Sequence, residues 1–431
     1  MAQTAAASPR TGISARQISL RGLVGLAVAL LALVVPPAAR AADEGFKTWL
    51  AVFWKDAEEF GISRETFNSA FRGVEPDLSL PDLVVPGRQR APRRGQAEFT
   101  RPPQDYISKS QIIRLSETGR ALKAKYASEL AKIEREIGVE AEAILAIWGR
   151  ETAFGTYRLP HYAIEALATQ AYLGRRKDMF RIELLHALRL LQYGVISREA
   201  LRSSWAGAVG LPQLMPSEFD KWAYDLDGDN RKDIWNSVPD ALATIARQLA
   251  GKGWVKGQTW GYEVRMPVSG KGSCALEGPE NARPLSEWAS LGFTRTRNRQ
   301  FPADQLGTEA YLMSPGGAYG PSFLVLENYR VIRRYNMSDL YAVFVGHLAD
   351  RIAGGGDFET PWQDISQLSS TSVEEIQRRL KSRGFRIDKV DGKVGSNTRW
   401  QIGSYQEAQR LKVDCWPTAG LLKHLQASAA P

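Results

Sequence analysis

The sequence predicts an α+β fold that is mainly α, with a small β-containing insert and a C-terminal three-helix module. Apolar residues recur at helical spacing over most of the chain, for example in residues 46–71 and 180–191. Between residues 254 and 323 the pattern changes to short apolar stretches broken by Gly and Pro, which is typical of strands and loops. Helical spacing returns over residues 328–352 and again near the C-terminus.

Length and composition indicate a folded protein of two or three domains, since 44% of the 431 residues are apolar and 24% are charged. The first 41 residues read as a signal peptide. Arg16 and Arg21 precede an apolar run over residues 23–35, and a small-residue cleavage site follows at residues 39–41. The run is short for a membrane span. We therefore expect a cleaved signal, a periplasmic location and no stable membrane anchor.

Charge and cysteine content further narrow the classes of partner and the covalent links to expect. The net charge is +9, and removal of the four arginines in residues 1–41 leaves +5. This balance suits an anionic polymer, yet the sequence carries no nucleic-acid motif, so we expect no nucleic-acid partner. Cys274 and Cys415 are the only cysteines. Export permits a disulfide between them, and the sequence leaves their pairing open.

The domain boundaries follow from a change in composition. Residues 43–352 form the main domain. Three consecutive glycines at residues 354–356 begin a polar stretch, which predicts a flexible linker over residues 353–371. A compact module follows at residues 372–428.

Glu151 is the leading candidate for a catalytic group. It follows Ile147 by four residues and Trp148 by three, so it shares an apolar helical stripe. A carboxyl group held against apolar side chains is desolvated, which raises its pKa and prepares it to act as a general acid. The alternative is a glutamate at a helix end that reaches solvent.

Two further segments suit the binding of a glycan. The loop over residues 204–217 is rich in Gly and Pro, and Ser204 and Gln213 offer neutral hydrogen-bonding groups for sugar hydroxyls and N-acetyl groups. The segment over residues 328–341 brings tyrosines and asparagines together. The alternatives are a packing turn for the first segment and an amphipathic helix with core tyrosines for the second.

An acidic loop near residue 230 resembles an EF-hand. Oxygen ligands are expected from four aspartates, with Asn236 in place of the usual bidentate Glu as the serious departure. The alternative is a solvated acidic turn. No cofactor is expected to be required, and a structural Ca²⁺ ion is the candidate ligand. The four candidate ligands are Asp225, Asp227, Asp229 and Asp240.

Taken together, the segments IWGRETAFG, SWAGAVGLPQLMPS, DLDGDNRKDIWNSVPDAL and NYRVIRRYN resemble the membrane-bound lytic murein transglycosylase B family. The resemblance implies a lysozyme-like catalytic domain. It also implies cleavage of the MurNAc–GlcNAc β-1,4 bond of peptidoglycan without water, which leaves 1,6-anhydroMurNAc ends. Glu151 falls on the family's single acid/base. No cysteine stands directly after the apolar run to carry a lipid anchor, so a soluble member is expected.

The resemblance also assigns substrate-binding positions. Arg247-Gln248 and Leu214 depart from the family pattern, so the substrate subsites are expected to differ in detail. The implied substrate-binding residues are Tyr106, Ser204, Gln213, Asn328, Tyr335 and Asn336.

The C-terminal module resembles small three-helix peptidoglycan-binding domains through VEEIQRRLKSRGF, VDGKVGSNTRWQIGSYQ and LKVDCWPTAGLLKHL, with Cys415 where such modules usually have Gly. The expected partners are peptidoglycan glycan strands, and other cell-wall enzymes are further candidates. Two alternatives remain open: a hydrolytic muramidase on the same fold, and a non-catalytic wall-binding scaffold.

Overall fold

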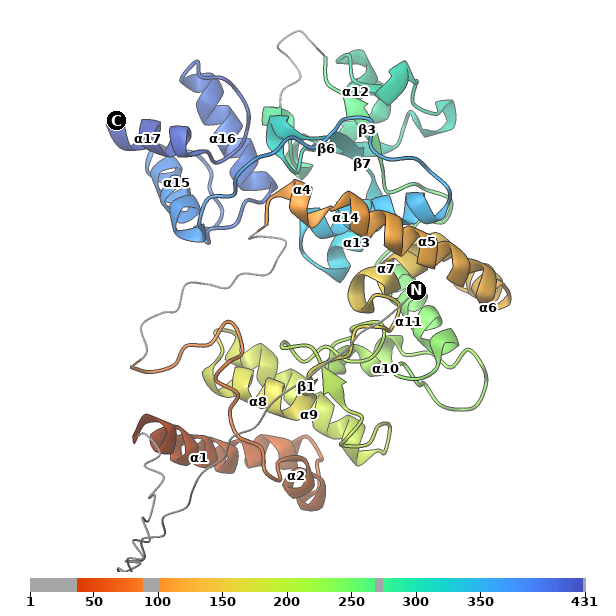
Figure 1. Ribbon diagram of the computed structural model, residues 1–431, viewed down its shortest axis with the longest axis vertical. Coiled ribbons are helices and arrows are strands. Elements are labelled where there is room, and N and C mark those ends of the chain that lie inside the picture. The colour runs from red at the N-terminus through yellow and green to blue at the C-terminus, as the bar shows by residue number, and fades with distance from the viewer. Residues whose placement is uncertain (1–36, 88–100, 268–273, 429–431) are drawn as a thin grey trace, which may run out of the picture.

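The computed structural model describes residues 37–87, 101–267 and 274–428 (Figure 1). Residues 1–36 of the expected signal peptide therefore lie outside the described part. Among the described residues, no helix combines the length and the apolar character that crossing a bilayer requires.

The N-terminal part of the chain forms a helical lobe, drawn in red and yellow at the bottom of Figure 1. Phe46, Phe53 and Phe180 are buried in its core, as the helical spacing predicts. Short strands β1 (His161–Tyr162) and β2 (Arg202–Ser203) pair beside it. The helices of this lobe are α1 (Pro37–Glu59), α2 (Arg64–Ala70), α8 (Ala163–Leu173), α9 (Lys177–Gln192) and α10 (Phe219–Trp222).

Helix α7 (Ala141–Thr152) lies at the centre of the second core, and it is buried on almost every face. Ile144 and Ile147 are fully buried, and Trp148 is nearly so. Four helices pack directly against α7: α5 (Lys109–Lys125), α6 (Ala127–Glu136), α11 (Val238–Gly251) and α14 (Asp339–Ile352). Two further helices complete this part of the molecule: α4 (Pro103–Tyr106) and α13 (Glu327–Tyr335).

The expected β-containing insert is a five-stranded antiparallel sheet in the order β4-β6-β7-β3-β5. Helix α12 (Leu285–Ser290) covers it, and its Trp288 is fully buried in a separate small core. The sheet stands at the top of Figure 1. Its strands are β3 (Gly261–Arg265), β4 (Arg283–Pro284), β5 (Thr294–Arg295), β6 (Glu309–Met313) and β7 (Ser322–Val325).

Residues 328–352 form two helices rather than one continuous helix. Helix α13 ends at Tyr335, and α14 begins at Asp339. Ser338 is the N-cap of α14, because its hydroxyl oxygen accepts a hydrogen bond from the backbone N–H of Tyr341 at 3.3 Å. The break places both helix ends beside the end of α7.

The C-terminal module is a three-helix bundle, as expected, drawn in blue in Figure 1. Ile376 and Leu380, which share one helical stripe in the sequence, are both fully buried in its core. Its helices are α15 (Ser370–Ser382), α16 (Ser396–Ala408) and α17 (Ala419–Ala427).

The segment over residues 353–371 differs from the flexible linker that its glycines predict. Phe358 stacks on the buried ring of His347 with ring centroids 3.9 Å apart. The backbone N–H of Glu359 donates to the carboxylate of Glu263 in strand β3 at 2.9 Å. The residues that follow the glycines therefore pack against α14 and strand β3. We call this packed part of the segment the strap.

Cys274 and Cys415 form a disulfide, which joins the insert to the module. Cys415 has a φ of 55°, the left-handed conformation that Gly adopts readily. Cys415 thus adopts the backbone conformation expected of a glycine at this position, with the strain that a Cβ atom adds. Gly403 lies directly behind the bridge, since a Cβ atom there would approach the Cys415 sulfur to 2.5 Å.

Candidate active site

Glu151 lies in the last turn of α7 and is partly buried. The helix ends sharply behind it, because Ala153 and Phe154 have φ values of 47° and 59° and Gly155 follows with 79°. Consecutive non-glycine residues in this conformation store backbone strain. Phe154 packs edge-on against Trp148 with ring centroids 5.4 Å apart, which holds the strained turn in place. Glu151 is thus presented at the edge of a rigid core.

Tyr341 of α14 donates a hydrogen bond from its hydroxyl to Oε1 of Glu151. Its side chain is 2% exposed. Burial, together with the neighbouring charge of Glu151, raises the pKa of Tyr341 well above its ordinary value of 10. The phenol therefore stays protonated and remains a hydrogen-bond donor at physiological pH.

Arg150 lies beside Glu151 in the sequence and packs between two aromatic rings. Its guanidinium is 4.6 Å from the ring centroid of Tyr106 and 4.7 Å from that of Phe344. It also donates to the Tyr106 hydroxyl. Tyr106, expected to line a groove, is only 3% exposed. The Tyr106 side chain therefore packs in the core and holds the partly exposed Arg150, and its role in substrate binding stays a prediction.

Two hydrogen bonds hold the 204–217 loop against the ends of α7 and α13. Thr152 donates from its hydroxyl to the backbone oxygen of Leu211 at 3.2 Å. The Tyr335 hydroxyl, at the end of α13, donates to the backbone oxygen of Pro212 at 2.6 Å. The loop, the end of α7 and the end of α13 are therefore fixed relative to one another around Glu151.

The loop needs its glycines because it passes close to other parts of the protein. A Cβ atom on Gly207 would lie 2.2 Å from the side chain of Leu167, and one on Gly210 would lie 2.8 Å from the backbone oxygen of Ile234. Both glycines also have positive φ angles. This explains a glycine-rich sequence in a loop that is shaped rather than mobile.

Ser204 and Gln213 are both partly exposed on this loop. The Ser204 Oγ accepts a hydrogen bond from the backbone N–H of Ala208 at 3.2 Å, which leaves the hydroxyl proton to be donated elsewhere. The Gln213 Nε2 donates to the backbone oxygen of Gly210 at 3.0 Å. The side-chain oxygen of Gln213 thus keeps its capacity to accept a hydrogen bond.

Asn328 requires a correction, because it is fully buried. Its Oδ1 accepts from the backbone N–H of Val255 at 2.8 Å, and its Nδ2 donates to the backbone oxygens of Val255 and Gln258. All its polar atoms therefore support the 255–258 turn, and none reaches a substrate. Asn336 is partly buried where α13 ends, next to Tyr335.

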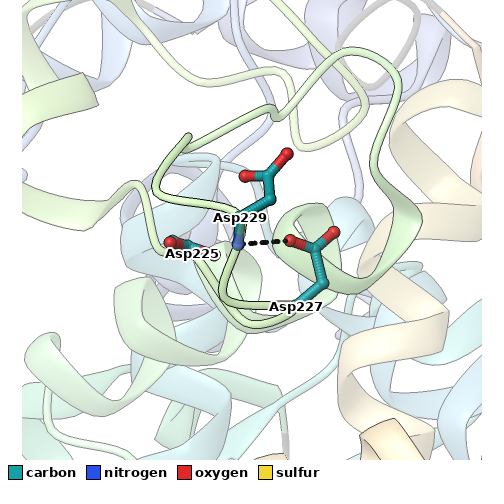
Figure 2. A group of neighbouring side chains, drawn as sticks. All are labelled: Asp225, Asp227 and Asp229. Atoms are coloured by element: carbon teal, nitrogen blue, oxygen red, sulfur yellow. Dashed lines mark hydrogen bonds between the residues drawn. The ribbon is translucent and has the colours of Figure 1, made fainter.

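The acidic loop brings three of its four expected ligands together. Carboxylate oxygens of Asp225, Asp227 and Asp229 all lie within 4.8 Å of one another (Figure 2). Asp240 is buried instead, and its two oxygens accept the backbone N–H groups of Leu226 and residue 233 at 2.8 and 2.9 Å. We therefore correct Asp240 from a metal ligand to a brace of the loop. The three remaining carboxylates are hard oxygen donors of the kind that Ca²⁺ prefers.

Sequence reasoning included Tyr341 only within the tyrosine-containing segment over residues 328–341, and it did not predict the contacts that Thr152 and Arg150 make. Both flank Glu151 in the sequence, so their proximity was visible. Their partners Leu211 and Tyr106 come from distant segments, which local patterns do not reveal.

The fold and this site define a mainly helical, lysozyme-like enzyme with one glutamate at the junction of three segments. The chain belongs to the transglycosylase SLT domain family, which residues 45–350 match, and residues 369–425 match the peptidoglycan binding domain family. It is 30% identical over 307 residues to membrane-bound lytic murein transglycosylase B of Escherichia coli (strain K12), covering 69% of this chain and 81% of that protein.

Solved structures agree with this assignment. SltB3 from Pseudomonas aeruginosa, in complex with NAG-anhNAM-pentapeptide, has a TM-score of 0.80 and 37% identity, covering 89% of this chain and 99% of that one. The Escherichia coli lytic transglycosylase Slt35 in complex with calcium has a TM-score of 0.50 and 26% identity, covering 60% and 80%. The expected fold class and enzyme class are both confirmed: this chain is a lytic transglycosylase homologue with a C-terminal peptidoglycan-binding region.

Proposed function

We propose that this enzyme cleaves the MurNAc–GlcNAc β-1,4 bond with Glu151 as its one acid and base. Glu151 first donates its proton to the glycosidic oxygen as the bond from C1 of MurNAc breaks. The C6 hydroxyl of the same sugar then bonds to C1, and Glu151 takes the hydroxyl proton. The enzyme returns to its starting state, and the product carries a 1,6-anhydro ring without the addition of water.

The observation that carries this proposal is the hydrogen bond from Tyr341 to Glu151 in a partly buried setting. The phenol binds one carboxyl oxygen and thereby fixes the plane of the group. In the proposed mechanism, the carboxyl group exchanges its proton with the sugar from this held position. Electrostatic groups fixed before the reaction lower its barrier, because they need no reorganisation.

A single carboxylate also fits the surroundings. Glycosidases of the usual kind need a second carboxylate as nucleophile or base. Glu218 is another acid whose charge acts on Tyr335, but it is engaged by Gln248 at 3.2 Å and by Lys252 at 3.6 Å. We propose that the N-acetyl group of the substrate assists instead, held by the free proton of the Ser204 hydroxyl.

Mass spectrometry of muropeptides released from purified sacculi tests this function. We expect products one water lighter than those of a muramidase, and we expect Glu151→Gln to abolish their release while sacculus binding persists. Products with reducing ends, which retain the added water, would favour the hydrolytic alternative. Undiminished release by the Glu151→Gln variant would remove Glu151 from the mechanism.

We further propose that the enzyme works in the periplasm after export and that glycan strands are its partners, with other cell-wall enzymes as additional candidates. The C-terminal region would keep the catalytic site close to an insoluble polymer.

Asp225, Asp227 and Asp229 would hold a Ca²⁺ ion, which would stabilise the loop without entering the reaction. Calcium titration by calorimetry, with Asp227→Asn as the variant, tests this site.

A further inference from the structure

Arg399 belongs to helix α16 of the C-terminal module, yet its guanidinium is buried in the main domain. The side chain is 2% exposed. Its Nε lies 3.0 and 3.2 Å from the two carboxylate oxygens of Glu277, and its Nη2 contacts Glu277 and lies 3.0 Å from Oδ2 of Asp339. Its Nη1 donates to the backbone oxygen of Val394 at 2.9 Å within the module. One side chain of the module thus joins two carboxylates of the main domain.

Asp339 is the first residue of α14, the helix that carries Tyr341. It is buried, and its Oδ1 accepts from the Tyr329 hydroxyl at 3.1 Å and pairs with Nε of Arg333 at 2.9 Å. Burial alone would raise the pKa of Asp339, but the guanidiniums of Arg333 and Arg399 outweigh it and lower the pKa. Asp339 is therefore an ionised anchor for the first turn of α14.

The same turn sets the position of Tyr341. Ser338, which precedes Asp339, caps the backbone N–H of Tyr341, and the Tyr341 hydroxyl binds Glu151. A displacement of this turn would move the phenol relative to the carboxylate. Because catalytic groups must be held to within a fraction of an ångström, such a displacement reduces the rate.

We propose that Arg399 is a positioning residue for Glu151, so that the peptidoglycan-binding module is part of the catalytic unit. The inference rests on the proposed role of Glu151. The path runs from Arg399 to the buried carboxylate of Asp339, along the backbone of the first turn of α14, and from Tyr341 to the partly buried Glu151.

A simpler role for Arg399 is to neutralise Glu277 and so dock the module. Glu277 is fully buried, and burial raises its pKa to about 7 even though Arg399 opposes the shift. Loss of Arg399 alone would leave this acid without its cation, which is costly in a protein interior. The test must therefore separate docking from the effect on α14.

The test compares Arg399→Gln with the double variant Glu277→Gln/Arg399→Gln, which removes both charges of the docking pair. Arg378→Met, which removes an exposed cation of the same module that pairs with Glu375, is the matched control. Initial rates are measured on soluble peptidoglycan oligosaccharides, and sacculus pull-down is measured separately. Glu151→Gln in the same assay reports on the proposed function itself.

We expect Arg399→Gln and the double variant Glu277→Gln/Arg399→Gln each to lose at least tenfold in kcat, with KM within about twofold of the wild type. Arg399→Lys should recover part of the loss in kcat. Arg378→Met should keep the wild-type kcat. If the double variant recovers the wild-type kcat, Arg399 serves only to neutralise Glu277 and the proposal is overturned. A wild-type kcat for Arg399→Gln overturns it as well. Activity of Glu151→Gln would instead refute the proposed function.

Discussion

Removal of the Cys274–Cys415 disulfide should destabilise the association of the insert with the module. The bridge closes a loop with a sequence separation of 141 residues. For a loop of this length, the chain-entropy estimate gives about 5 kcal/mol at 25 °C, and measured values for disulfides are typically about 2–4 kcal/mol. The long loop makes this bridge a strong constraint on the unfolded chain.

Other contacts between the module and the main domain determine whether the module stays docked when the bridge is absent. The Tyr319 hydroxyl donates to Asp414 at 2.8 Å, and the Arg399 pair persists. We therefore expect a native-like reduced protein with lower stability rather than a detached module. The bridge spans 141 residues, so the scale for units of about 150–250 residues applies, and a loss of about 2–4 kcal/mol corresponds to a fall of about 4–16 °C in Tm.

Differential scanning calorimetry with and without a reducing agent measures this effect. Cys274→Ala/Cys415→Gly is the matched variant, because Gly suits the left-handed backbone at residue 415. We expect the reduced wild type and the variant to unfold at similar, lower temperatures, and we expect the reductant to leave the variant unchanged. Equal Tm values for oxidised and reduced wild type would refute the reasoning.

Three further predictions concern single side chains. Tyr341→Phe removes a hydrogen bond to a carboxyl group that becomes charged as it gives up its proton, so we expect kcat for muropeptide release to fall about 10–100-fold with KM nearly constant. An unchanged kcat would contradict this. Asn328→Ala leaves three backbone groups without partners, so we expect the free energy of unfolding, measured in urea, to fall by about 2–3 kcal/mol. A variant with unchanged stability and a raised KM would instead show that Asn328 binds the substrate. Burial lowers the pKa of His347 to about 4. The unfolded chain therefore binds a proton between pH 6.5 and 4 that the folded chain does not, and the free energy of unfolding should fall by up to about 3 kcal/mol over this range. In thermal unfolding, His347→Phe should reduce the dependence of stability on pH over this range. An unchanged pH dependence would show that other groups cause it.

The sequence predicted much of the catalytic helix because its signal is local. Ile147, Trp148 and Glu151 lie within two helical turns, so their shared stripe follows from the geometry of the helix alone. The same reasoning found the β-containing insert and the three-helix module, whose strands and helices show their own periodicities.

Side-chain roles that depend on distant segments could not be predicted in this way. Asn328 and Asn336 look alike in the sequence, but the 255–258 turn covers the first and buries it completely. Asp240 lies close to the acidic loop in the sequence, yet two backbone N–H groups occupy its oxygens. Which polar group meets which is decided by packing.

The sequence by itself determined the helices, the insert, the module and the acid at the end of α7, because each depends on residues a few positions apart. Only the tertiary structure decided that Cys274 meets Cys415, that the glycine-led strap packs on His347, and that Arg399 reaches Asp339. Periodicity records which face of an element is apolar. It carries no information about which of the many apolar or charged faces in a chain of 431 residues will be brought together.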